Sequence, residues 1–66
     1  LQPLRLIECK AEMVPLTQKT LDQALIYNRR LRVPYLILHN GVQTIVVKVS
    51  ESGVERLANI PSFPND

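Results

Sequence analysis

Two charged side chains lie close together near the start of the chain, within a run of residues typical of a strand. In the stretch LIECKAE, residues 6–12, one residue separates Glu8 from Lys10. Side chains alternate along a strand, so both charges are expected on one face and Cys9 on the other. A carboxylate can bind Mg²⁺, and a nearby ammonium can orient a water or offset negative charge on a phosphate. The pair is therefore a candidate site for phosphodiester hydrolysis.

A Glu-x-Lys triplet has a simpler explanation, because many such triplets form weak ion pairs on solvated strand faces. The neighbouring residues favour a catalytic role for this pair over a surface ion pair. Glu8 and Lys10 end an apolar run that predicts an interior strand, where unpaired charge is costly unless a metal or ligand uses it.

The helix that follows contributes a second candidate pair. Gln23 and Tyr27 are four residues apart, so they are neighbours on one side of a helix, beside the apolar stripe. They could hydrogen-bond a phosphate or a metal-bound water. The alternative is that Tyr27 packs at the edge of the core while Gln23 is solvated.

Three of the eight basic residues, Arg29, Arg30 and Arg32, fall within four positions at the end of the predicted helix. Cations there complement the negative end of the helix dipole. They could equally contact a nucleic-acid backbone, and the sequence leaves both explanations open.

The remaining reactive side chains point to structural roles. His39 is expected to be a surface strand residue, and Cys9 a small buried apolar residue. With one Cys and one His, the chain has neither an internal disulfide nor a zinc-binding set. This favours a cytoplasmic setting.

The elements that position these residues follow from the pattern of apolar residues and turn signals. Thr17 is the expected helix N-cap, and Pro34 disfavours helix at the residue before it. Asn40-Gly41 predicts a two-residue type I′ turn between antiparallel strands, and Ser50 to Gly53 predicts a second turn. The expected elements are a strand at 3–10, a helix at 18–31, strands at 35–39 and 42–49, and a short strand at 54–57.

This order predicts an α/β fold, in which a mixed sheet contains one βαβ crossover helix followed by an Asn-Gly β-hairpin. The crossover is expected to be right-handed. With 66 residues, of which 45% are hydrophobic and 21% charged, the chain suits one small folded domain. No apolar run approaches the roughly 20 residues that span a bilayer.

The combined motifs resemble a known family of nucleases. The segment LIECKA (6–11), a helix carrying Gln23-x-x-x-Tyr27-Asn28, and VPYLILHNG (33–41) are similar to the N-terminal nuclease domain of type I restriction enzyme restriction (R) subunits, in the PD-(D/E)xK superfamily. The resemblance covers residues 3–61. It implies a partial restriction-endonuclease-like core, formed by the C-terminal half of that domain.

The resemblance also implies roles for individual residues. Glu8 corresponds to a metal-binding acid, Lys10 to the catalytic lysine, and Gln23 and Tyr27 to a motif that borders the active site. The family's other metal-binding acid, an Asp on the preceding strand, has no counterpart among the seven residues before Glu8. The isolated chain is therefore expected to be inactive, and whether it is an enzyme by itself stays open. No phosphate-binding glycine loop is present, so ATP use is not supported.

The leading hypothesis is a fragment of a Mg²⁺-dependent DNA endonuclease, with Arg29 and Arg30 on the DNA backbone. Modification and specificity subunits would be further partners if the parent is a full restriction subunit. The alternative is a catalytically inactive nuclease-like module for DNA binding or assembly. A third possibility is self-association through an exposed sheet edge.

Overall fold

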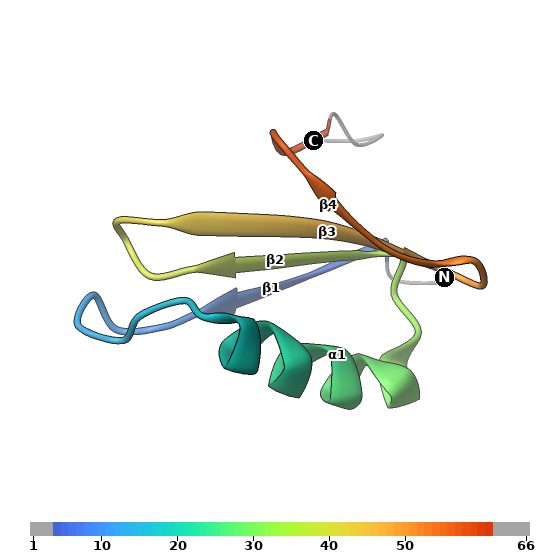
Figure 1. Ribbon diagram of the computed structural model, residues 1–66, viewed down its shortest axis with the longest axis horizontal. Helices are drawn as coiled ribbons and strands as arrows, with labels where there is room; N and C mark the ends of the chain where they lie inside the picture. Colours follow the sequence, from blue (N-terminus) through green and yellow to red (C-terminus); the bar gives the residue numbers. More distant parts are fainter. Residues whose placement is uncertain (1–3, 62–66) are drawn as a thin grey trace.

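The computed structural model describes residues 4–61, which form one helix and a four-stranded sheet (Figure 1). The elements are, in chain order, β1 (Arg5–Cys9), α1 (Gln18–Leu31), β2 (Tyr35–His39), β3 (Thr44–Ser50) and β4 (Gly53–Leu57). The predicted strand start at residue 3 and the tail beyond residue 61 lie outside the described residues. The α/β class and the mixed sheet expected from the sequence are confirmed.

The sheet order is β1-β2-β3-β4, so each strand pairs with the one that follows it along the chain. β1 and β2 are parallel, with Glu8 opposite Leu38, and α1 makes the crossover between them. β2 and β3 are antiparallel, as are β3 and β4. β1 is thus an edge strand of the described sheet, whereas the sequence predicted an interior strand.

α1 begins and ends as its local chemistry predicts. The Thr17 hydroxyl accepts a hydrogen bond from the Thr20 backbone N–H at 3.3 Å, and the Thr20 hydroxyl accepts one from the Thr17 N–H at 3.3 Å. At the other end, the Arg32 N–H donates to the Asn28 carbonyl at 2.7 Å, with Arg32 in the left-handed conformation (φ 56°). The Thr17–Thr20 capping box thus starts the helix, and the left-handed conformation of Arg32 ends it.

The main core lies between α1 and one face of the sheet (Figure 1). Leu21 and Ala24 of the helix pack with Leu36, Leu38 and Val47 of the sheet. The three strand side chains are 1% exposed, and burying each contributes about 1.5–3 kcal/mol. The opposite face holds a smaller buried cluster of Ile37 and Val46, with Tyr35 and Leu57 packed against it.

Asn28 belongs to the buried stripe of α1, although its side chain is polar. Its amide nitrogen donates to the Val33 carbonyl at 2.9 Å, and its amide oxygen accepts from the Val33 N–H at 3.0 Å. One side chain therefore satisfies both backbone groups of Val33, where the chain leaves the helix. These bonds explain how an amide is accommodated at 3% exposure.

The turn between β2 and β3 differs from the predicted type I′ turn. His39 pairs with Thr44, so four residues, 40–43, connect the strands, and β3 begins at Thr44 rather than at residue 42. Within this turn, only Gly41 has a positive φ (+91°), whereas a type I′ turn requires two such residues. The Asn40 amide oxygen instead accepts from the N–H groups of Val42 at 3.0 Å and Gln43 at 2.7 Å.

Candidate active site

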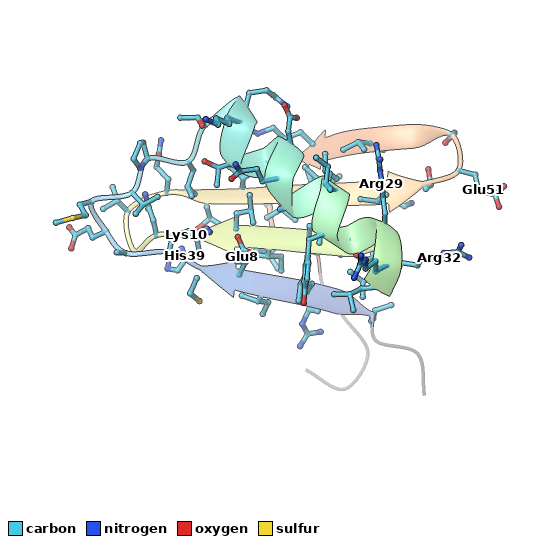
Figure 2. The ribbon with its side chains drawn as sticks, turned by 90° about the horizontal axis from the view of Figure 1, so that it is seen from below. Glu8, Lys10, Arg29, Arg32, His39 and Glu51 are labelled. Carbon is cyan, nitrogen blue, oxygen red and sulfur yellow. The ribbon has the colours of Figure 1, made fainter. Side chains whose placement is uncertain are left out.

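Glu8 and Lys10 lie together on the side of β1 that faces α1, as strand alternation predicts. Their neighbour in alternation, Leu6, packs against the main core, which identifies that side. Lys10 Nζ is 3.2 Å from a Glu8 carboxylate oxygen, and the two side chains are 37% and 34% exposed. Figure 2 shows both residues at the end of β1 that leads into the loop before the helix.

This arrangement leaves both groups accessible. An ion pair exposed to this degree contributes at most about 1 kcal/mol, so a ligand can replace it at low cost. The Glu8 carboxylate can then contact a cation, and the Lys10 ammonium an anion, while the strand stays folded. The pair can therefore bind a metal and a phosphate at neighbouring positions.

Two hydrogen bonds hold the chain on either side of the loop that follows Lys10. The Lys10 N–H donates to the His39 carbonyl at 2.7 Å, which extends the β1–β2 ladder by one bond. The Asn40 amide nitrogen donates to the Val14 carbonyl at 2.8 Å, and Asn40 is 5% exposed. Asn40 thus connects the loop after the Glu8 strand to the β2–β3 turn, a role that the sequence analysis missed.

Gln23 and Tyr27 lie on the exposed part of α1, and Tyr27 is 58% exposed. Successive helix residues are about 100° apart, which places Tyr27 and Arg29 on nearly opposite flanks of α1. Arg29 lines a groove with Val49 and Ser50, so its flank faces β3. The flank of Tyr27 therefore faces the β1 side, where Glu8 and Lys10 lie. The side chains of Gln23 and Tyr27 form no hydrogen bond with another described residue, and their active-site roles stay predictions.

The two remaining candidates lie on the other face of the sheet. Cys9 pairs in register with His39, and both are exposed. The prediction that Cys9 is buried is wrong, because β1 is an edge strand and nothing in the described part of the chain covers that position. The His39 ring nitrogen Nδ1 is 2.9 Å from the Thr44 hydroxyl and 3.2 Å from the Gln43 carbonyl, in keeping with a surface strand residue.

The described residues offer a limited set of metal ligands. Residues 4–61 contain no cluster of three His, Cys, Asp or Glu side chains. Glu8 therefore supplies one carboxylate, next to the ammonium of Lys10. Mg²⁺ is commonly bound through one or two carboxylates together with water and substrate phosphates, so Glu8 fits one position of such a site.

The basic residues at the end of α1 are all exposed, but they do not share one surface. Arg29 and Arg32 line the same groove beside the β3–β4 turn, whereas Arg30 does not.

Within residues 4–61, no helix combines the length and apolar character that a membrane span requires.

Comparison with known proteins places the chain in a family. No curated protein and no solved structure matches it. A family model described as type I restriction enzyme R protein N terminus (HSDR_N) matches residues 1–64, nearly the full 66. This match agrees with the resemblance carried by the Glu8-x-Lys10 strand and the Gln23-x-x-x-Tyr27 helix. The chain therefore belongs to the family of type I restriction enzyme R protein N-terminal domains.

Proposed function

We propose that the chain is part of a Mg²⁺-dependent DNA endonuclease, and that Glu8 and Lys10 are its catalytic pair. The observation that carries this proposal is their position. A carboxylate and an ammonium lie 3.2 Å apart on one side of β1, both partly open to solvent, in a chain of a restriction-enzyme family. That combination suits phosphodiester hydrolysis within a PD-(D/E)xK site.

In this proposal Glu8 holds the metal together with a second acid from outside the described residues. The bound Mg²⁺ would supply Lewis-acid stabilisation of the phosphate and a site for a nucleophilic water. Lys10 orients the attacking water and offsets negative charge at the scissile phosphate. Lys10 directly follows β1, and its position beside Glu8 allows it to act near the metal.

Residues of α1 have supporting roles in the same proposal. Tyr27, on the flank that faces β1, and Gln23 orient groups at the border of the site. Arg29 and Arg30 attract the DNA backbone from the end of the helix, where both are exposed. The family suggests modification and specificity subunits as further partners. A cytoplasmic location also stays a prediction.

Substitution of Glu8 and Lys10 in the natural full-length protein tests the proposal. Glu8→Gln and Lys10→Gln should each abolish Mg²⁺-dependent cleavage of plasmid DNA. Glu12→Gln is the matched control, because it removes an exposed carboxylate four residues along the chain from Glu8. Cleavage that survives in either Glu8→Gln or Lys10→Gln would contradict the proposal.

A second function is favoured by one observation: residues 4–61 contain no cluster of three metal-binding side chains, and Glu8 is the carboxylate that they bring to the candidate site. A nuclease-like domain without a complete metal site would serve as a DNA-binding or assembly module. It would bind DNA in a salt-sensitive manner that Arg29 and Arg30 substitutions weaken. Absence of metal-dependent cleavage in the full-length parent, together with such binding, would support this function over the nuclease.

A further inference from the structure

A groove lies beside the C-terminal end of α1, at the opposite end of the molecule from Glu8 and Lys10 (Figure 2). It has a volume of about 460 Å³. Its lining residues come from the end of the helix, the segment after it and the β3–β4 turn: Leu25, Asn28, Arg29, Arg32, Val33, Val49, Ser50 and Glu51. Segments about 20 residues apart in the sequence therefore form one concave surface.

The charged groups of this groove have no partners in the described part of the chain. The side chains of Arg29, Arg32 and Glu51 form no hydrogen bond or ion pair with any residue of 4–61. Glu8 and Lys10, by contrast, neutralise each other at 3.2 Å. Figure 2 shows Arg29, Arg32 and Glu51 gathered at the same end of the molecule. Two guanidinium groups are thus available to a ligand.

The backbone at Arg32 supports a binding role for its side chain. Arg32 has φ 56°, and it is the one non-glycine residue with a positive φ among residues 4–61. Glycine is the usual residue at a left-handed helix end, because a Cβ there is strained. An arginine at such a position loses stability relative to glycine. Strain of this kind is often found where the side chain has a function.

The charge balance of the groove defines the ligand. Arg29 and Arg32 contribute two positive charges and Glu51 one negative charge, which leaves a net charge of +1 (2 − 1). The helix C-terminus adds partial negative charge, which disfavours an anion, so binding of an anion here depends on the guanidinium groups and not on the helix. A guanidinium fork matches phosphate oxygens, and a phosphodiester carries one negative charge.

We propose that the groove binds a phosphodiester group of a nucleic-acid backbone, held between Arg29 and Arg32. Leu25 and Val49, which are partly exposed, offer apolar contacts to the adjoining sugar. The choice of DNA as the polymer rests on the proposed function. The groove lies beside the C-terminal end of α1, away from Glu8 and Lys10. Binding of a phosphodiester in the groove therefore does not require the proposed cleavage chemistry.

DNA binding by the full chain, measured by fluorescence anisotropy of a labelled duplex in EDTA, tests this site. Arg29→Gln removes one guanidinium, and Arg32→Asn removes the other while keeping a residue that tolerates the left-handed conformation. Each should weaken binding about tenfold, as expected for loss of a charge-assisted contact. In NMR spectra, the amide resonances of Arg32, Ser50 and Glu51 should shift when the duplex is added.

Lys19→Gln is the matched control, because Lys19 is an exposed cation on the same helix but does not line the groove. It should weaken binding only through general charge, about threefold or less. An equal loss in Lys19→Gln, or Ser50 and Glu51 resonances that do not move, would overturn the proposal. The EDTA condition separates the two sites: Arg29→Gln and Arg32→Asn should weaken binding in the absence of metal, where the proposed cleavage by Glu8 and Lys10 cannot occur.

Discussion

At the scale of single residues, Glu8 and Lys10 form a contact on which the fold depends little. Their ion pair is about one-third exposed, so it adds little to folding. The local strand, rather than the ion pair, holds the two groups side by side. In the proposed function, a metal or a phosphate replaces this ion pair while the fold remains unchanged.

This leads to a prediction that separates activity from stability. Lys10→Gln should lower the free energy of unfolding by no more than about 1 kcal/mol, because only a partly solvated ion pair is lost. Chemical denaturation of the variant and the native chain would measure this difference. A much larger loss would show that Lys10 is structural, and lost cleavage could then not be assigned to catalysis.

Asn28 should behave in the opposite way, because its side chain is buried and bonded. Asn28→Ala leaves the N–H and the carbonyl of Val33 without their side-chain partners. The expected loss is about 2–3 kcal/mol in the free energy of unfolding, and denaturation would measure it. Arg30→Ala, at an exposed position of the same helix, should change stability by less than about 0.5 kcal/mol. Similar effects of the two substitutions would contradict this account.

At the scale of elements, the C-terminal end of α1 combines a good cap with a strained residue. The Arg32 N–H closes the helix on the Asn28 carbonyl, but its Cβ disfavours the left-handed conformation. Arg32→Gly should therefore stabilise the chain by about 0.5–1 kcal/mol. Thermal unfolding should show a higher midpoint, whereas an unchanged or lower midpoint would argue that Arg32 is not strained.

The loop between β1 and α1 depends on an element that is distant in sequence. Asn40 forms one hydrogen bond to Val14 and two within its own turn. In Asn40→Ala, the Val14 carbonyl and the N–H groups of Val42 and Gln43 lose their side-chain partner. We expect the free energy of unfolding to fall by about 2 kcal/mol. Hydrogen exchange should become faster at Val42 and Gln43. Ser52→Ala, in the exposed β3–β4 turn, is a control that should leave exchange at these two amides unchanged.

At the scale of the whole molecule, α1 covers one face of the sheet, and the described sheet has two edge strands. β1 and β4 are the edge strands, and Ile7 of β1 is 54% exposed. Unpaired edges favour pairing with another chain, and a charged residue on the edge opposes it. We therefore expect concentration-dependent self-association of this chain, which Ile7→Lys should reduce. Sedimentation of both forms would measure it, and a strict monomer at high concentration would contradict the prediction.

Local chemistry in the sequence was sufficient to predict the main elements. The helix was expected at 18–31 and is observed at Gln18–Leu31, because Thr17, the apolar stripe and Pro34 act within a few residues of one another. The shared face of Glu8 and Lys10 follows in the same way, since strand alternation is a property of the backbone itself. Such features need no knowledge of distant neighbours.

Burial and turn geometry were decided by the tertiary structure. Cys9 is exposed because β1 lies at an edge, and strand order cannot be read from the composition of one strand. Four residues, 40–43, form the turn that contains Asn40. The Asn40 side chain forms hydrogen bonds within this turn and to Val14, 26 positions away. The groove of Arg29, Arg32 and Glu51 likewise exists only because the helix end packs beside the β3–β4 turn. Long-range packing determines such juxtapositions, whereas spacing along the chain determines only which residues share a face.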